Sequence, residues 1–306
     1  MNHRNWINWK QFFIIAGMGI LAIPLILYSR LISLRPPRTD VEKLLFQGIV
    51  YKRDVRLSPR PLVIHRVTID LTAPGVKVFV TPGTPTSDNT VTNARTTSEF
   101  VREFKLQLAI NANFFYLFRE KTPWDYYPHS GDRTTVIGQA ISNGNRYSPP
   151  KPNWSALCFL GSDRAQIVEQ GNCPEGTVQA VAGNRLFVNH SKPVTASFSK
   201  QSNNKPYSRI AVAVDQQGQK LWLIAVDGKQ PFYSEGVTLA ELAEIVINLG
   251  ADQALNLDGG GSSTLVMATS SGTTVLNAPI HTKLPMVERP VANHLGFYAL
   301  PATENQ

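Results

Sequence analysis

The sequence of 306 residues is poor in charged side chains and in cysteine. Charged residues make up 17% of the chain, and its two cysteines are too few for a cysteine-rich zinc module. The chain contains neither a P-loop, a G-x-S-x-G elbow, nor a basic run with interleaved aromatics. These absences argue against a P-loop nucleotidase, an α/β-hydrolase and a nucleic-acid partner. What the chain does contain, 42% hydrophobic residues with 21 glycines and 21 prolines, is typical of a strand-rich domain with many turns.

The net charge of +8 is concentrated at the N-terminus. Residues 1–38 hold five basic residues and no acidic one, which leaves 25 basic and 22 acidic residues, a net +3, in the remainder. Phe12–Tyr28 is an uncharged run of 17 residues, at the short end of what crosses a bilayer. Trp6 and Trp9 precede it, as interfacial aromatics do. We predict one N-terminal transmembrane helix, an uncleaved signal anchor, with a cleaved signal peptide or a buried core helix as alternatives.

The predicted anchor and a proline-rich stalk, Arg35-Pro-Pro-Arg38, make up residues 1–38, and residues 39–306 form the second, exported domain. Flanking charges on both sides of the span leave its orientation open. The exported placement therefore rests on the stalk and on Cys158 and Cys173. These two cysteines lie 15 residues apart around a strand-like stretch, which in an exported protein indicates a disulfide. Two reduced, buried cysteines are the alternative.

Apolar patterns predict many strands and few helices. Two nearly continuous apolar runs, Ser208–Asp215 and Lys220–Asp227, predict central strands covered on both faces. Helices are predicted at Thr97–Phe104 and Leu239–Leu249, each with a capping box at its start, whereas Val41–Tyr51 has no period and predicts no element. Further strands are predicted at Leu62–Asp70, Val76–Val80, Leu106–Ile110, Trp154–Leu160, Ala165–Glu169, Val178–Ala182, Gln253–Leu257, Thr264–Ala268 and Val291–Leu300. The predicted fold class is α+β, with a mixed, strand-rich sheet core.

Residues 116–153 contain five prolines and predict a long loop. Connections of this length are often lids or binding loops. The aromatic side chains in it suit stacking on a sugar ring, and packing onto the core is the alternative use; they are Trp124, Tyr126, Tyr127 and Tyr147.

The most informative segment is Asn256-Leu-Asp-Gly-Gly-Gly-Ser-Ser-Thr264. An aspartate at the end of a buried strand is followed by three glycines, which let backbone N–H groups approach a ligand. Such amides form a nest for a phosphate or a carboxylate, and a glycine-rich bulge or turn is the alternative. A serine nucleophile at Ser262 or Ser263 needs a histidine partner. The sequence offers only unplaced candidates for it: His65, His129, His190, His281 and His294.

Further polar residues stand at the ends of predicted strands. If those ends converge, the residues form one site with two carboxylates, amides and arginine cations that can hold a phosphate. Taken singly, each is explained as a turn or cap residue. No cofactor is required, although a Ca²⁺ ion bound by carboxylate and carbonyl oxygens near Asp258 is compatible with this set. The strand-end residues are Asn111, Asn113, Arg209, Asp227, Arg289 and Asn293.

Five segments occur in an order that resembles one enzyme family. They are Arg209-Ile-Ala-Val-Ala-Val-Asp215, Leu223-Ile-Ala-Val-Asp-Gly228, Gly236-Val-Thr-Leu-Ala-Glu-Leu-Ala243, Leu257-Asp-Gly-Gly-Gly-Ser-Ser-Thr264 and Glu288-Arg-Pro-Val-Ala-Asn293. The order resembles the phosphodiester glycosidase family, of the N-acetylglucosamine-1-phosphodiester α-N-acetylglucosaminidase type with bacterial exopolysaccharide-related relatives. The family often shows N-G-G-F/Y-F where this chain has Asn111-Ala-Asn-Phe-Phe115, so side chains at 112 and 113 are expected to narrow the pocket.

The resemblance implies a hydrolase that releases a sugar, such as N-acetylglucosamine, from a phosphodiester-linked or envelope glycan conjugate. It implies catalytic carboxylates at Asp258 and Asp227, and arginines at 209 and 289 that hold phosphate or sugar hydroxyls. The remaining expected substrate-binding residues are Asn111, Asn113, Gly259, Gly260, Gly261, Ser262, Ser263 and Asn293. The expected partners are a glycan or sugar-phosphate substrate and, through the N-terminal helix, a membrane. A non-catalytic envelope glycan-binding protein that uses the same pocket is the alternative.

Overall fold

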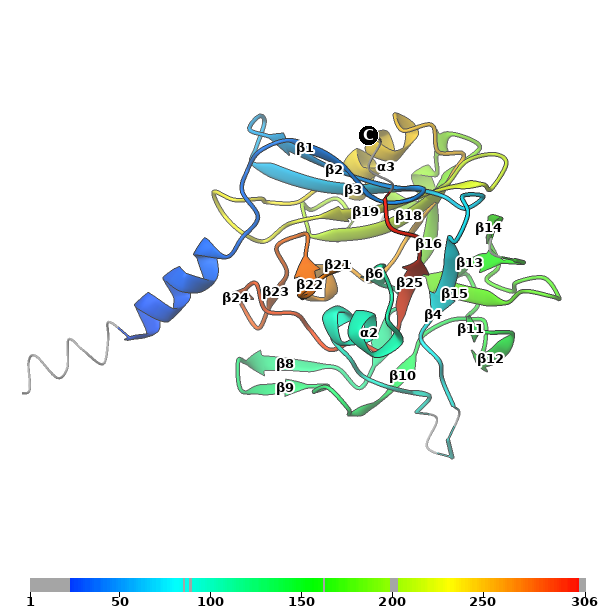
Figure 1. The fold of residues 1–306 in the computed structure, drawn as a ribbon, viewed down its shortest axis with the longest axis horizontal. Helices are drawn as coiled ribbons and strands as arrows, with labels where there is room; N and C mark the ends of the chain where they lie inside the picture. The colour runs from blue at the N-terminus through cyan, green and yellow to red at the C-terminus, as the bar shows by residue number, and fades with distance from the viewer. Residues whose placement is uncertain (1–22, 85, 88–89, 162, 199–202, 303–306) are drawn as a thin grey trace, which may run out of the picture.

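An eight-stranded sheet is the largest element of the computed structural model, which describes residues 23–302 apart from 85, 88–89, 162 and 199–202. Figure 1 shows this sheet along the upper side of the molecule, with helix α3 (Leu239–Ile247) on its outer face. In spatial order its strands are β1 (Val41–Phe46), β2 (Ile49–Arg56), β3 (Leu62–Asp70), β19 (Lys220–Val226), β18 (Arg209–Val214), β20 (Gln253–Asn256), β16 (Arg185–Asn189) and β17 (Lys192–Pro193).

Two five-stranded sheets pack below the large one. The first carries helix α2 (Thr97–Phe104) and is ordered β22 (Gly272–Val275), β21 (Leu265–Thr269), β6 (Leu108–Asn111), β25 (His294–Tyr298) and β4 (Lys77–Val80). The second is ordered β12 (Asn145–Ser148), β11 (Ala140–Ser142), β15 (Gln179–Gly183), β13 (Ser155–Phe159) and β14 (Ala165–Val168).

Smaller pieces complete the fold around these sheets. They are a three-stranded sheet of β5 (Thr92–Asn93), β10 (Arg133–Val136) and β7 (Phe115–Tyr116), the hairpins β8 (Arg119–Thr122)–β9 (Asp125–Tyr127) and β23 (Ile280–His281)–β24 (Leu284–Pro285), and the 3₁₀ turns η1 (Thr195–Phe198) and η2 (Gly260–Ser262). The predicted long loop over 116–153 is thus a series of short strands, β8 to β12.

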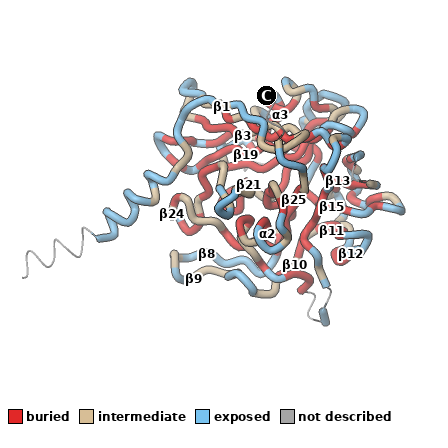
Figure 2. Tube along the Cα trace, viewed as in Figure 1, coloured by how far each residue is buried: buried red, intermediate tan, exposed pale blue. Residues whose placement is uncertain are grey.

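The core lies between the sheets, where Figure 2 shows the buried residues. Strands β18 and β19 explain why their sequences are continuously apolar. Ile210, Val212 and Val214 pack into the core between the sheets, while Ala211 and Ala213 face α3. Because both faces of these strands are covered, neither face needs polar side chains. The predictions for these two strands, for β3 and for both capped helices are confirmed.

The predicted mixed sheet is wrong in the part of the chain that the structure describes, where every strand pair is antiparallel. The connection through α3 shows why. It carries the chain from β19 to β20, and these strands run in the same direction, but β18 lies between them and is antiparallel to both. Val41–Tyr51, for which no element was predicted, forms β1 and the start of β2.

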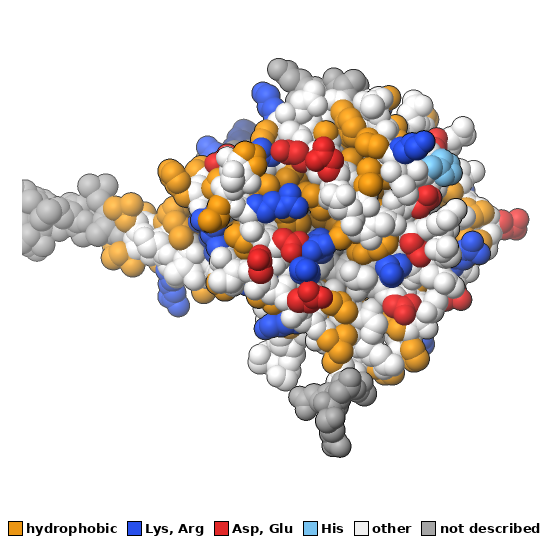
Figure 3. All heavy atoms as spheres, turned by 90° about the horizontal axis from the view of Figure 1, so that it is seen from above, with side chains coloured by type: hydrophobic (Ala, Val, Ile, Leu, Met, Phe, Trp, Pro, Cys, Tyr) orange, Lys and Arg blue, Asp and Glu red, His pale blue; other side chains and the backbone are white. Residues whose placement is uncertain are grey.

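The predicted membrane span, Phe12–Tyr28, lies mainly outside the described residues. Within them, none of the helices has the length and apolar character needed to cross a membrane. Residues 23–33 form a helix that projects from the domain, and Figure 3 shows hydrophobic side chains where it leaves the main body. The proline-rich segment after it packs on the domain: Tyr233 donates a hydrogen bond to the Pro36 carbonyl (3.0 Å), and Arg35 stacks on the Tyr233 ring.

Candidate active site

A cavity of about 300 Å³ lies where β18 begins and β20 ends. Antiparallel pairing of these strands sets Ala211 opposite Asn256, so Arg209 at the start of β18 comes close to the segment after β20. The cavity therefore collects residues from distant parts of the sequence. Its walls are formed by Phe114, Phe118, Glu120, Asn184, Asn203, Tyr207, Ser208, Arg209, Lys229, Asn256, Leu257, Asp258, Gly259, Gly261 and Arg289.

The three glycines after Asp258 make room for other parts of the protein. A Cβ on Gly261 would lie 2.2 Å from Nη2 of Arg289, and a Cβ on Gly259 would lie 2.7 Å from the Ser208 carbonyl oxygen. Gly260 has φ +65°, in the left-handed region that glycine adopts without strain. Each of the three positions therefore excludes a larger residue for a separate steric reason.

The amides of the glycine segment are used mainly inside the protein, which differs from the predicted anion nest. The N–H of Gly260 donates to the Ser208 carbonyl at 2.9 Å, and the N–H groups of Ser262 and Ser263 donate to Gly259 and Gly260. The amide of Gly259 hydrogen-bonds the carboxylate of Asp258. The cation that this cavity offers to an anion is therefore Arg289 rather than a ring of free amides.

Arg289 connects two carboxyl groups of the cavity. Its Nη1 donates to the Ser262 hydroxyl at 3.1 Å, and Ser262 in turn hydrogen-bonds Asp258. Its Nη2 is paired with Oε2 of Glu120, its Nε donates to Nδ1 of His281 at 3.3 Å, and its guanidinium stacks on the Phe118 ring at 4.6 Å. Arg289 is thereby fixed from four sides in one position at the cavity wall.

The two carboxyl groups next to Arg289 have opposite pKa shifts. Burial raises the pKa of Asp258 to about 6, although the Ser262 hydroxyl, the Arg289 cation and the Gly259 amide each act to lower it. The nearby His281 ring, together with Arg289 and the Thr282 amide, holds the pKa of Glu120 at about 2, against the effect of burial. Near neutral pH, Glu120 is a carboxylate while Asp258 exchanges a proton readily, a pairing typical of acid–base sites.

Asp227, the other carboxylate expected at the site, lies in a buried cluster away from the cavity. Its Oδ2 is 3.0 Å from Nε2 of His65, whose Nδ1 is 2.8 Å from the Tyr51 hydroxyl. Its Oδ1 accepts hydrogen bonds from the Asn277 amide group and from the backbone N–H of Ala278. Both oxygens of this carboxylate are thus engaged by internal partners, because Asp227 turns toward His65 on β3 instead of toward the cavity.

The predicted asparagines are buried behind the cavity wall and hold its loops together. Asn111 donates to the carbonyl of Asp258 (2.6 Å) and accepts from the amide of Thr264 (3.0 Å). Asn113 and Asn293 hydrogen-bond each other, and the Asn113 side chain therefore does not narrow the cavity, in contrast to the prediction. Gly260, Ser262 and Ser263 are buried with them. These residues position the site rather than line it.

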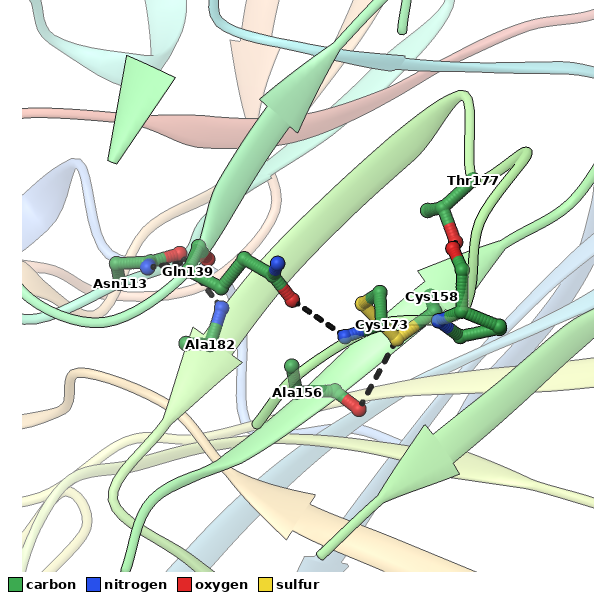
Figure 4. The surroundings of a disulfide bond; sticks show 8 residues. Asn113, Gln139, Ala156, Cys158, Cys173, Thr177 and Ala182 are labelled. Carbon is green, nitrogen blue, oxygen red and sulfur yellow. Dashed lines mark hydrogen bonds between the residues drawn. A yellow bond between two sulfur atoms is a disulfide. The ribbon is translucent and has the colours of Figure 1, made fainter. Parts of the chain in front are cut away.

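Figure 4 shows how this packing reaches the disulfide. Asn113 accepts a hydrogen bond from the Ala182 amide, and its side-chain amide donates to the Gln139 carbonyl. The side-chain oxygen of Gln139 accepts from the amide of Cys173 at 2.7 Å. Cys173 and Cys158 form a disulfide with their Cα atoms 5.7 Å apart, which confirms the predicted bond. A disulfide is typical of a domain outside the cytoplasm.

Arg209 lines the cavity as predicted, but its guanidinium is largely committed to the backbone. Nε donates to the Val237 carbonyl at 3.3 Å, and Nη2 lies 3.4 Å from the carbonyl of Lys205. The calcium ion considered near Asp258 stays a prediction. Among the described residues, no group of three or more His, Cys, Asp or Glu side chains could hold a metal ion.

Sequence reasoning missed Glu120 and did not assign a role to His281. Glu120 lies within the segment predicted as a binding loop, and that prediction was the only signal for it. No recognisable motif links either residue to Arg289. In sequence, Glu120 lies 169 residues from Arg289, and His281 lies 8 residues from it.

A family model described as phosphodiester glycosidase matches residues 104–298, which is more than half of the chain. Two curated relatives are the N-acetylglucosamine-1-phosphodiester alpha-N-acetylglucosaminidases of Bos taurus, 32% identical over 98 residues, and Mus musculus, 35% identical over 99 residues. Each match covers 30% of this chain and 18% of the relative, so the aligned part is a small share of those proteins.

Two solved structures share the fold. A hypothetical protein from Synechocystis superposes with a TM-score of 0.59 and 18% identity over 86% of this chain and 64% of its own. The zebrafish N-acetylglucosamine-1-phosphodiester alpha-N-acetylglucosaminidase catalytic domain, auto-inhibited by its pro-peptide, superposes with a TM-score of 0.58 and 19% identity over 88% and 87%. At these identities the likeness shows the fold alone.

Proposed function

The chain belongs to the phosphodiester glycosidase family, and we propose that it hydrolyses a phosphodiester-linked glycan conjugate with release of the sugar. N-acetylglucosamine is the proposed sugar, since the curated relatives are named for it. The observation that carries the proposal is the arrangement of Asp258, Arg289 and Glu120 in one cavity, with the pKa of Asp258 raised to about 6.

The proposed reaction uses Asp258 as the general acid. The bond between the anomeric carbon and the phosphate oxygen breaks, its electron pair stays with the phosphate oxygen, and the oxygen of a water molecule bonds to the anomeric carbon. Asp258 gives its proton to the leaving phosphate oxygen, and the proton lost by the water passes through solvent to the Asp258 carboxylate, which returns to its protonated form. A phosphate monoester has a second pKa of about 6, so Asp258 is matched to the group that it protonates.

Arg289 supports this step through its charge. The cleaved phosphate gains negative charge as it leaves, and a fixed guanidinium stabilises that charge more in the transition state than in the substrate. Glu120 keeps Arg289 in place as an ion pair. We assign Glu120 a positioning role, because its carboxylate oxygens are occupied by Arg289 and by the Thr282 amide at 2.6 Å.

The small cavity suits a single sugar. Asn203 and Asn256 offer side-chain oxygens to sugar hydroxyls, since their amide nitrogens donate inside the protein, and the Phe114 ring in the wall offers a surface for stacking. We further propose that the domain works outside the cytoplasm, held by the N-terminal segment. The disulfide supports an extracytoplasmic location, and the anchor itself rests on the sequence of residues 12–28.

The test is hydrolysis of the methyl diester of N-acetylglucosamine 1-phosphate by the full chain. The wild type is expected to release the sugar, and Asp258→Asn to lower kcat by about 10²–10⁴-fold, the usual contribution of a general acid. The matched control is Asp163→Asn, in the exposed turn between β13 and β14, which is expected to leave kcat unchanged.

Two results would overturn the proposal. One is the absence of sugar release by folded wild-type protein from this diester, from UDP-N-acetylglucosamine and from p-nitrophenyl glycosides. The other is full activity of Asp258→Asn. Binding of the sugar conjugate without turnover would favour the glycan-binding alternative.

A further inference from the structure

A second, larger hollow opens beside the active-site cavity. Its volume is about 810 Å³, and it shares Glu120, Lys229, Gly261 and Arg289 with the smaller cavity. The β8–β9 hairpin, the turn between β23 and β24, and Tyr28 of the N-terminal helix complete its walls. Figure 1 shows the β8–β9 hairpin and β23–β24 along this side of the molecule. The two hollows therefore meet at Arg289, where the scissile phosphate is proposed to lie.

Lysine side chains give the larger hollow its charge. Lys121, Lys229 and Lys283 line it together with Arg289, and the carboxylate among the lining residues, Glu120, is already paired with Arg289. Lys121 lies 3.9 Å from Asp125, whereas Lys229 and Lys283 form no salt bridge within 4.0 Å across the described part of the chain. All three lysines are exposed. The hollow thus presents ammonium groups to which an anionic group of a ligand can bind.

The backbone at two of these lysines adopts a conformation that glycine fits better. The φ angle is +59° at Lys229 and +66° at Lys283. A side chain in this left-handed region costs energy, and since both lysines are exposed, burial does not offset that cost. At Lys283 this conformation belongs to the two-residue turn between β23 and β24, and at Lys229 it occurs in the segment after β19. The Nζ of Lys229 lies 4.3 Å from the centre of the Tyr207 ring, and both lysines bring a positive charge to the hollow.

We infer that the larger hollow is an aglycone subsite, which binds a second anionic group on the leaving part of the substrate. The inference rests on the proposed function, because the proposed function places the sugar in the small cavity and the scissile phosphate at Arg289. The substrate class is then a polyanionic glycan, with phosphate or carboxylate groups beyond the bond that is cut. Trp124, 82% exposed at the rim, offers a ring on which a further sugar can stack.

The experiment compares three diesters of N-acetylglucosamine 1-phosphate. Their alcohol parts are methanol, glycerol phosphate and glyceric acid, so that the second group is absent, a phosphate or a carboxylate. The wild type is expected to show a kcat/KM about tenfold higher for the charged diesters, since two or three exposed charge contacts each give a severalfold gain. This preference is expected to shrink with added salt, because screening lengths are about 10 Å at 0.1 M.

The variant Lys121→Gln/Lys283→Gln is expected to reduce the ratio of kcat/KM between charged and methyl diesters about threefold to tenfold, since Lys229 remains in the hollow. Both side chains are exposed, so the substitutions leave the fold intact. The matched control is Lys77→Gln/Lys192→Gln, which removes two exposed lysines from β4 and β17. That control is expected to keep the wild-type ratio. An equal preference for phosphate and carboxylate supports recognition of charge, and a preference for one of them names the anion.

A binding measurement separates this inference from the proposed function. Calorimetric titration of Asp258→Asn protein with the same three compounds gives their affinities without turnover. Tighter binding of the charged compounds, lost in the Asp258→Asn protein that also carries Lys121→Gln/Lys283→Gln, supports the subsite even if no diester is hydrolysed. Equal affinities and equal kcat/KM for all three compounds, or a preference that the double lysine substitution leaves unchanged, overturns the subsite even if the methyl diester is hydrolysed.

Discussion

Replacement of Ser262 by alanine tests the proposed role of Asp258 through the pH dependence of the reaction. The Ser262 hydroxyl is fully buried and hydrogen-bonds the Asp258 carboxyl, which lowers its pKa against the larger effect of burial. A hydrogen bond to a charged group is worth about 1.5–3 kcal/mol, and one pKa unit corresponds to about 1.4 kcal/mol. Loss of the bond is therefore expected to raise the pKa of Asp258 by about one unit, from about 6 to about 7.

The direction of the pH effect follows from the proton that Asp258 must carry as a general acid. If the protonated form is active, kcat/KM is constant below the pKa and falls about tenfold per pH unit above it. At about pH 8 the wild type then retains about 1% of its plateau and Ser262→Ala about 10%. The assay is sugar release from the methyl diester between about pH 4 and pH 9, with Ser271→Ala, in an exposed turn, as the control. Two results would refute the assignment of Asp258 as the general acid. One is an activity that rises with pH through 6, and the other is an alkaline limb of the pH profile that lies at the same pH in Ser262→Ala as in the wild type.

Three other substitutions test the surroundings of the site. Gly261→Ala is expected to cost about 1–3 kcal/mol of stability and to lower kcat/KM, because its Cβ would displace Arg289; thermal melts and kinetics check this. Glu120→Gln is expected to lower the melting temperature more at pH 7 than at pH 3, because a carboxylate with a pKa of about 2 stabilises the fold above its ordinary pKa and loses that effect as the pH falls. Asp227→Ala is expected to lower the free energy of unfolding by about 3–5 kcal/mol, since it leaves His65 and two other buried donors without their acceptor. A change in the free energy of unfolding below about 1 kcal/mol, measured by urea denaturation, would contradict this expectation.

Elements with local signals could be predicted from the sequence. The helix α3 begins after Thr238, which forms a capping box with Glu241 in the first turn of the helix, and Gly250 after the helix has φ +90°. Strands β1 and β8 were missed for a physical reason. Val41–Phe46 is an edge strand with three exposed positions, and Arg119–Thr122 is almost wholly exposed, so neither carries an apolar pattern.

Part of the candidate site could be predicted from the sequence. This is the part where antiparallel pairing brings together residues that stand at the ends of two adjacent strands. Asp258, Arg209 and Gly259 line one cavity because β18 and β20 are adjacent. The pattern could not give the direction of a side chain after a strand ends, which is why Asp227, one residue beyond β19, contacts β3 instead. It could not give Glu120 either, since no short motif links a residue in a hairpin to a partner 169 positions away.

The ion pair between Glu120 and Arg289 has a consequence for Asp258 that separates positioning from general packing. The negative charge of Glu120 opposes the field of the Arg289 cation, which by itself lowers the pKa of Asp258. Glu120→Gln leaves that cation without its partner and removes a negative charge, and both changes favour ionised Asp258. The alkaline limb of kcat/KM is therefore expected to move to lower pH in Glu120→Gln and to higher pH in Ser262→Ala. A loss of packing alone would move the two limbs in the same direction or not at all, so the opposite displacements distinguish an electrostatic connection through Arg289 from simple damage to the site.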